Sequence, residues 1–127
     1  MDNYVMLPQT MERYFKMASA FDVFEGPPHS HLTVRVEKRA QRNGDILWGV
    51  YESERSCFNK STKKFEFESQ PSSRTDEDLA DTRFTFQQAM NIAEQVADQF
   101  REGVRKWQDG ARIPFLYFEI DSTKINI

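Results

Sequence analysis

Apolar residues recur every three or four positions between Phe84 and Gly110, which is the spacing of one face of an α-helix. The stripe consists of Phe86, Ala89, Met90, Ala93, Val96, Ala97, Phe100, Val104 and Trp107. Thr85 stands just before the stripe, with Gln88 three residues later, which is the pattern of a capping box. Gly110 stands where a left-handed C-terminal cap is common. These signals predict a long helix over about residues 85–109, with a sheet packed against its stripe.

Alternation between apolar and polar residues predicts strands in the middle of the chain. The expected strands are residues 32–39, 46–52, 55–59 and 64–68. Asn43 and Gly44 join the first two and are a strong hairpin signal, because both residue types tolerate the positive φ of a tight turn. In the last strand, Phe65 and Phe67 are expected to face inward. The middle of the chain is therefore predicted to form an antiparallel meander of about four strands.

Three further elements are expected nearer the two ends of the chain. A short amphipathic stripe ending at Phe21 predicts an N-terminal helix over about residues 11–22. Residues 113–120 are apolar on both faces, which predicts a well-covered strand. Ile125 and Ile127 predict a short final strand, so these last residues are expected to join the sheet.

Residues 70–81 form a long polar stretch between the meander and the long helix. They predict a loop, in which Thr75 and Asp78 are spaced to open one short helical turn. With 127 residues, the chain has the length of one domain, and we expect a single α+β domain over residues 1–127. The sheet face away from the long helix needs a cover, which the N-terminal helix or the second subunit of a homodimer would supply.

The composition and the first residues of the chain indicate where the protein is located in the cell. Cys57 is the only cysteine, which rules out an intramolecular disulfide and a cysteine-based zinc site and fits a reducing cytosol. No apolar run has the length of a membrane span. The first ten residues lack the basic and apolar regions of a secretory signal. We therefore expect a cytoplasmic protein that does not enter a membrane.

The sharpest charged feature lies within the polar stretch and suits a basic surface on a partner protein. Its residues are Arg74, Asp76, Glu77, Asp78 and Asp81. The run lacks the glycine turn and the terminal glutamate of an EF-hand loop, so it does not predict a calcium site. A solvated loop explains the same composition. Arg74 and Arg83 are expected to pair with Asp76, Asp78 or Asp81 and so to order the loop.

Basic residues on and after the predicted hairpin give a second candidate surface. They are Arg35, Lys38, Arg39, Arg42, Lys60, Lys63 and Lys64, with Trp48 and Tyr51 nearby in the sequence. Basic side chains interleaved with aromatic rings on a sheet suit phosphate contact and base stacking. The net charge of −3 and the interspersed acidic residues favour an ordinary solvated face instead. Nucleic-acid binding is therefore the alternative function.

Candidate catalytic and metal-binding residues are few. His29 and His31 would point the same way in an extended segment, but two histidines do not complete a metal site. Cys57 with either histidine would be a nucleophile pair, although a lone cysteine among aromatic residues is usually part of the core. Glu66 and Glu68 would share one face of their strand, as a carboxylate pair for acid–base catalysis does. No catalytic residue, metal or cofactor is predicted, and a small enzyme stays the third alternative.

Residues 59–89 carry a resemblance to known proteins. This segment contains an Asn-Lys turn at Asn59, the aromatic–glutamate strand 65–68, the sequence PSSRTDEDLA at 71–80, and Thr-Arg-Phe leading into the long helix. About a quarter of the chain in this way resembles small uncharacterised proteins of bacteriophages and bacterial mobile elements. The resemblance carries over no site residue. It implies an accessory protein that acts by binding inside a bacterial cell or a phage-infected host. The acidic run, the net charge of −3 and the lack of a catalytic constellation make a non-catalytic protein-binding function the leading prediction.

Overall fold

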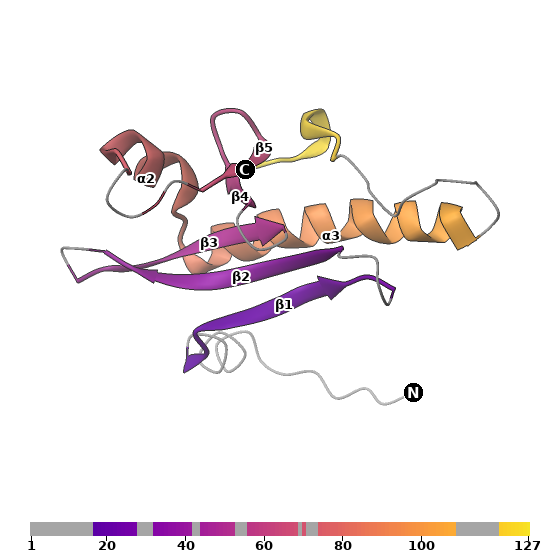
Figure 1. The fold of residues 1–127 in the computed structure, drawn as a ribbon, viewed down its shortest axis with the longest axis horizontal. Helices are drawn as coiled ribbons and strands as arrows, with labels where there is room; N and C mark the ends of the chain where they lie inside the picture. The colour runs from indigo at the N-terminus through magenta and orange to yellow at the C-terminus, as the bar shows by residue number, and fades with distance from the viewer. Residues whose placement is uncertain are drawn as a thin grey trace.

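A sheet and one long helix make up the two layers of the fold (Figure 1). The computed structural model describes residues 17–27, 32–41, 44–52, 56–68, 70, 74–108 and 120–127. The strands are β1 (Ala20–Glu25), β2 (Thr33–Ala40), β3 (Ile46–Glu52), β4 (Ser56–Asn59) and β5 (Lys64–Phe67). The helices are α2 (Asp76–Thr82), α3 (Phe86–Gln108) and the 3₁₀ turn η2 (Ser122–Lys124).

The five strands form one antiparallel sheet in the order β1-β2-β3-β4-β5. Each strand therefore pairs with the next one along the chain, and the predicted meander and α+β class are confirmed. In the β2–β3 hairpin, Val36 lies opposite Val50 and Lys38 opposite Trp48. Gly44, in the connecting turn, has a φ of 89°, which a glycine adopts without strain.

The core lies between α3 and the sheet face that it crosses. The fully buried residues of α3 are Ala89, Ile92, Ala93, Val96, Ala97 and Phe100. The strands contribute Val34, Val36, Trp48, Val50 and Phe58. The rings of Trp48 and Phe86 meet edge to face with centroids 5.1 Å apart. The predicted packing of a sheet on the helix stripe is confirmed.

The start of α3 is fixed by two sets of hydrogen bonds. The Thr85 N–H donates to Gln88 Oε1 (2.9 Å) and the Gln88 N–H donates to Thr85 Oγ1 (3.2 Å), which is the predicted capping box. Just before it, Trp48 and Phe84 exchange two backbone hydrogen bonds of 2.7 and 2.8 Å. This bridge ties Phe84, two residues before the first residue of α3, to β3.

The first strand replaces the end of a predicted helix. The prediction of a helix over residues 11–22 is wrong from Ala20 onward, where β1 begins; residues 11–16 lie outside the described residues. The strand has a register shift between Asp22 and Phe24. It lets Phe21 and Phe24, three residues apart, both reach the α3 side, where they contact Phe86 and Phe100 respectively. A strand with a bulge can therefore place two apolar residues three positions apart on the same face, which is also the spacing of a helix face.

Two predictions near the end of the sheet are corrected. Phe65 packs against Phe58, but Phe67 is 68% exposed, because alternation fixes the face of a residue and not how far the core extends. Ile125 is fully buried, but it follows the turn η2 and is not part of a strand. The predicted strand over residues 113–120 falls outside the described residues except for Ile120, which is not in a strand.

Candidate functional site

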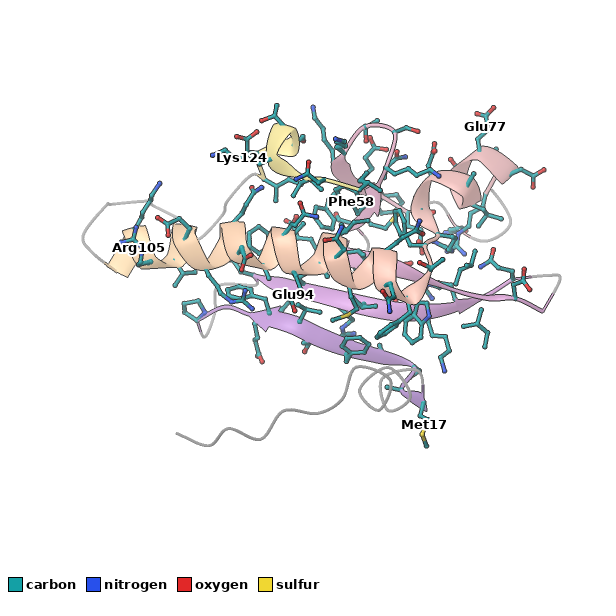
Figure 2. The ribbon with its side chains drawn as sticks, turned by 180° about the vertical axis from the view of Figure 1, so that it is seen from behind. Met17, Phe58, Glu77, Glu94, Arg105 and Lys124 are labelled. Carbon is teal, nitrogen blue, oxygen red and sulfur yellow. The ribbon has the colours of Figure 1, made fainter. Side chains whose placement is uncertain are left out.

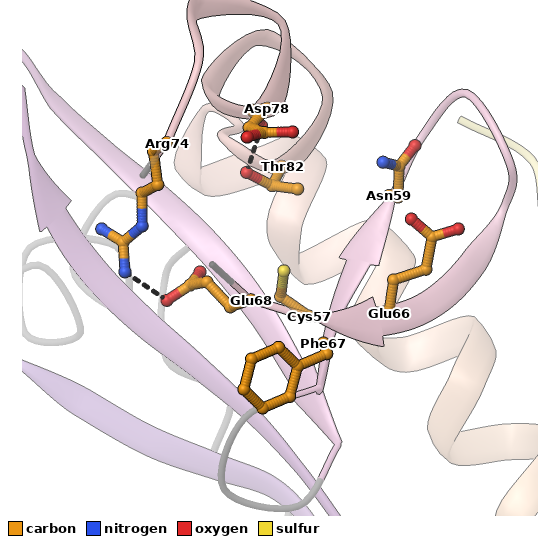
Figure 3. Close-up of a pocket in the computed structure, with 8 residues that line it drawn as sticks. All are labelled: Cys57, Asn59, Glu66, Phe67, Glu68, Arg74, Asp78 and Thr82. Carbon is orange, nitrogen blue, oxygen red and sulfur yellow. Dashed lines mark hydrogen bonds and ion pairs between the residues drawn. The ribbon is translucent and has the colours of Figure 1, made fainter. Parts of the chain in front are cut away.

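Four side chains converge on Glu68, the residue directly after β5. The Tyr51 hydroxyl donates to Glu68 Oε2 (2.6 Å), and Arg74 donates to Glu68 Oε1 (2.9 Å, Figure 3). Arg83 donates to Oε2 (3.3 Å), and the Arg39 guanidinium lies 3.6 Å from Oε1. We call these five residues the Glu68 cluster. It joins β2 and β3 to the segments on both sides of α2.

The strands β2 and β3 position the sheet half of the cluster. The Tyr51 ring lies over Gly49, where a Cβ atom would come within 2.6 Å of the ring. The Arg39 guanidinium lies 4.9 Å from the Tyr51 ring centroid, and its Nε donates to the Tyr51 hydroxyl (2.8 Å). Glu37 holds the other side of Arg39 at 2.7 Å. The tyrosine hydroxyl is therefore fixed between a guanidinium and a carboxylate.

Arg83 supplies a deeply buried charge. Its side chain is 3% exposed, and its Nη1 also donates to Thr82 Oγ1 (3.1 Å). Its buried Nε has no hydrogen-bond partner among the described residues. Since an unpaired buried cation is costly, the position of Arg83 depends on the carboxylate of Glu68.

The environment of the cluster fixes its protonation states. Burial by itself would raise the pKa of Glu68, but the Tyr51 hydrogen bond and the three guanidinium groups outweigh it and hold the pKa below its ordinary value. Burial, helped by the hydrogen bond to Glu68, raises the pKa of Tyr51. At neutral pH the cluster therefore contains an ionised carboxylate and a neutral tyrosine.

Cys57 lies beside the cluster as a buried thiol. Burial raises its pKa to about 11, and the negative charge of Glu68 adds to the effect. A catalytic cysteine needs the opposite shift, because the thiolate is the nucleophile. The structure thus gives Cys57 the properties of a core residue.

A small cavity of about 40 Å³ opens between α2 and the β4–β5 hairpin. It is lined by Cys57, Asn59, Glu66, Phe67, Glu68, Arg74, Asp78 and Thr82. Figure 3 shows Asp78 and Thr82 on the α2 side and Asn59 and Glu66 on the hairpin side. Small-molecule sites are usually about 300–1,000 Å³, so this cavity suits water or one side-chain head group.

The predicted acidic run forms the first half of α2. Thr75 and Asp78 make the predicted capping box, since the Asp78 N–H donates to Thr75 Oγ1 and the Thr75 N–H donates to Asp78 Oδ2. Asp76 and Glu77 are exposed, and Figure 2 shows Glu77 pointing away from the sheet. Asp81 accepts a hydrogen bond from the Ser61 hydroxyl (2.7 Å). Only part of the run is therefore left to face solvent.

The arginines beside this run have a different partner from the one expected. The sequence predicted that Arg74 and Arg83 pair with Asp76, Asp78 or Asp81. In the structure, both guanidinium groups form ion pairs with Glu68. The short helix uses its own carboxylates for the N-terminal cap and the first turn, where the helix dipole favours them. Both arginines therefore anchor the segment that contains α2 to the sheet.

The predicted basic surface is divided between two faces and largely paired. Arg35 pairs with Asp22 (3.1 Å) and Arg39 with Glu37, on the face away from α3. Lys38 lies on the other face, 5.5 Å from the Trp48 ring centroid. Trp48 and Tyr51 are only 1% and 2% exposed, so neither ring is available for stacking with a base.

The remaining basic residues lie on or beside the β4–β5 turn. Lys60 and Lys64 are exposed, whereas the ammonium group of Lys63 donates to the Ile125 carbonyl (3.0 Å). Arg42, His29 and His31 lie outside the described residues. Within the described part of the chain, no group of three or more acidic, histidine or cysteine side chains is arranged to hold a metal ion.

Sequence reasoning missed the centre of the cluster. Glu68 was considered only as half of a carboxylate pair with Glu66, yet its partners stand between 6 and 29 positions away in the chain. No local spacing reveals such long-range contacts. The nearest signal is the glycine two residues before Tyr51, because a missing side chain in a strand often marks close packing.

Comparison with protein families, with curated proteins and with solved structures finds no match to this chain. None of the helices in the described ranges is both long and apolar enough to cross a membrane. Function has to be inferred from the geometry of the chain itself.

Proposed function

We propose that the protein is a non-catalytic binding protein that recognises a basic surface on a partner protein. The observation that carries the proposal is an exposed aromatic ring at the rim of a cavity that α2, the acidic helix, also lines. Asp76 and Glu77 on α2 are exposed, and the exposed Phe67 shares the rim of the small cavity with Asp78 and Glu66. In the described part of the chain, Glu66, Asp76 and Glu77 make no ion pair.

This surface has the two parts that a protein interface needs. Unpaired carboxylates attract a basic partner from a distance and fix its orientation. An exposed aromatic ring supplies apolar contact area, and aromatic residues are enriched at interface centres. The cavity beside Phe67 has room for one basic head group from the partner.

Nucleic-acid binding has less support. It would need basic side chains without acidic partners and exposed aromatic rings on the β2–β3 hairpin. The rings of Trp48 and Tyr51 are buried instead, and Arg35 and Arg39 form ion pairs with carboxylates. A small enzyme has no specific observation in its favour, because the Cys57 thiol is protonated at neutral pH and Glu68 is held in ion pairs.

The setting and the oligomeric state are also proposals. The resemblance of residues 59–89 supports an accessory protein of a phage or mobile element, acting in the bacterial cytoplasm. The homodimer expected from the sequence stays a prediction. The described part of the sheet face away from α3 gives it no apolar surface, because this part carries ion pairs such as Arg35–Asp22. A sedimentation mass equal to the monomer at micromolar concentration would rule it out.

The test is capture of partners from a bacterial lysate with three forms of the protein. The first is the wild type, and the second is Asp76→Asn with Glu77→Gln, which removes two charges and keeps their shape. The third is Glu94→Gln with Asp98→Asn, which removes two charges from exposed positions of α3. We expect proteins held by the wild type and by the α3 variant to be lost from the α2 variant and at high salt. Capture that is the same for all three forms contradicts the proposal.

A second measurement separates the alternative function. The purified protein is titrated against labelled single- and double-stranded DNA and RNA by fluorescence anisotropy at two salt concentrations. We expect no binding even at low salt. Tight binding that weakens steeply with salt would indicate phosphate contacts and replace the protein-binding proposal.

A further inference from the structure

The cavity between α2 and the β4–β5 hairpin receives polar side chains from both sides (Figure 3). Cys57 and Asn59 are two residues apart in β4, and Glu66 lies opposite Cys57 in β5, so these three side chains share one face of the hairpin. Asp78 and Thr82 are four residues apart in α2 and share one side of the helix. The fold thus brings Glu66 and Asp78 from separate elements to one cavity.

The lining of this cavity carries more negative than positive charge. Its charged residues are three carboxylates and one cation, namely Glu66, Glu68, Asp78 and Arg74. Arg74 donates to Glu68 (2.9 Å), so these two charges compensate each other. Among the described residues, the Glu66 side chain accepts no hydrogen bond and forms no ion pair. Asp78 uses Oδ2 to accept from the Thr75 N–H (3.0 Å) and keeps Oδ1 as a further acceptor. Two carboxylates of the lining are therefore available to a cation.

The two walls of the cavity are tied together by contacts within the chain. The Ser61 hydroxyl in the β4–β5 turn donates to Asp81 Oδ1 (2.7 Å), and the Lys60 N–H donates to the Asp81 carbonyl (2.9 Å). These contacts hold the turn of the hairpin against the end of α2. On the helix, the Thr82 hydroxyl donates to the Asp78 carbonyl (2.6 Å). Because the walls are already in place, a bound group does not have to order them, which favours binding.

The volume of the cavity suits the head group of a lysine. At about 40 Å³, it has room for about three small non-hydrogen atoms, because one water molecule needs about 10–15 Å³ of such volume. A lysine ends in a compact ammonium group, whereas an arginine ends in a larger planar guanidinium group. Within the described ranges, no group of three or more acidic, histidine or cysteine side chains is arranged to hold a metal ion. Size and charge together therefore favour an ammonium group over a guanidinium group or a metal ion.

We propose that this cavity is an anchor pocket for one lysine side chain of the partner protein. The inference rests on the proposed function and names the residue through which the basic partner is recognised. The ammonium group has three donors and no acceptor, and it lies between Glu66 and Asp78 and donates to both carboxylates. The methylene groups of the lysine lie against Phe67, which lines the cavity and is exposed. Acetylation of the lysine removes its charge and prevents binding.

The experiment follows the amide signals of the ¹⁵N-labelled full chain by NMR at low salt. The probes are short glycine peptides, blocked at both ends, whose central residue is lysine, arginine or acetyl-lysine. We expect the lysine peptide to bind with a millimolar dissociation constant and to shift the Glu66, Asp78 and Thr82 amides more than the Glu94 amide on α3. The arginine peptide should bind at least about fivefold more weakly, and the acetyl-lysine peptide should not bind. Glu66→Gln should weaken binding of the lysine peptide about fivefold, whereas Glu94→Gln, which removes one charge from an exposed position of α3, should not.

Several outcomes would overturn the proposal. One is equal binding of the lysine and arginine peptides, or no binding of either. Another is a set of shifts spread over α3 as much as over the cavity, which would indicate general attraction to negative charge. A third is a Glu66→Gln chain, shown to be folded by its dispersed NMR spectrum, that binds the lysine peptide as the wild type does. If this variant does not fold, the comparison of the three peptides on the wild type decides. Failure of the proposed function has a different sign, because it appears as lysate capture that does not depend on Asp76 and Glu77.

Discussion

The Tyr51 hydroxyl and the guanidinium groups of Arg74 and Arg83 approach Glu68 from three parts of the chain. Taking charges out of water is costly, and a buried pair repays the cost only when each group is well satisfied. Here one carboxylate serves several donors, and the largest desolvation cost falls on Arg83, the most buried of them. Loss of Glu68 should therefore cost more than loss of any single hydrogen bond.

Glu68→Gln tests this dependence. The substitution keeps the shape of the side chain but leaves the buried Arg83 cation uncompensated, so we expect the free energy of unfolding to fall by about 3 kcal/mol. Urea denaturation followed by circular dichroism measures the change. Glu66→Gln, two residues earlier and exposed, is the matched control and should change stability by less than about 0.5 kcal/mol. Equal effects of the two substitutions would show that the cluster does not stabilise the fold.

The same carboxylate predicts a pH dependence. The pKa of Glu68 is lowered from 4.5 in the folded state, so its contribution is complete above that value and is lost as the pH falls through the folded pKa. We expect the stability difference between wild type and Glu68→Gln to shrink as the pH falls below about 4.5 and through the folded pKa. Urea titrations across this range measure it, and a difference that stays constant would contradict the lowered pKa.

Cys57 should behave as a protected thiol. Because burial raises its pKa to about 11, the native protein should react slowly with Ellman's reagent at pH 8, a pH at which an exposed cysteine is partly ionised. In denaturant the reaction should be complete at once. Fast reaction of the native chain would mean that the thiol is accessible, and it would revive the nucleophile hypothesis.

At the scale of elements, the two helices begin with the same device. Thr75 with Asp78 opens α2, and Thr85 with Gln88 opens α3. Both starts were predictable, because a capping box is a local pattern of four residues whose hydrogen bonds form wherever the helix forms. The hairpin at Gly44 was predictable for the same reason.

Thr75→Ala tests the importance of the α2 cap. The loss of the side-chain acceptor should lower stability by about 1 kcal/mol. It should also loosen the segment that carries Arg74 and Arg83 to Glu68. Thermal unfolding measures the first effect, and the exchange rate of the Asp78 amide measures the second. Thr62→Ala in the exposed β4–β5 turn is the control, and an equal loss there would indicate that capping is not the cause.

Elements whose signal depends on neighbours were harder to predict. In β1, the register shift at Asp22 places Phe21 and Phe24 on one face, and no sequence period distinguishes this from a helix turn. Phe67 alternates as an inward residue does, but it stands where the core has ended. The final strand expected at Ile125 and Ile127 is wrong: residues 122–124 form a turn. The main chain beside this turn is held by Gln95 and Gln99 of α3, two polar residues at helical spacing that carry no further signature in the sequence.

For the whole molecule, the two sheet faces differ in kind. The face on α3 is apolar, whereas the opposite face carries a row of alternating charges along β2, with Arg35 and Arg39 on either side of Glu37. Farther along, the Glu68 cluster covers Tyr51. Among the described residues, this second face is therefore held by polar contacts, whereas the face on α3 is held by apolar packing. Surface charges could be counted in the sequence, but their pairing depends on strand register, which only the folded sheet fixes.

Gly49 has a consequence for how this sequence can vary among homologous chains. Its backbone does not need a glycine, because Gly49 does not have a positive φ. Among the glycines of the described residues, the positive φ is found at Gly44. The space is needed instead by the ring of Tyr51. A larger residue at this position should be accepted only together with loss of the tyrosine, which would in turn deprive Glu68 of its closest donor. Gly49, Tyr51 and Glu68 are therefore expected to covary, retained or replaced as a set.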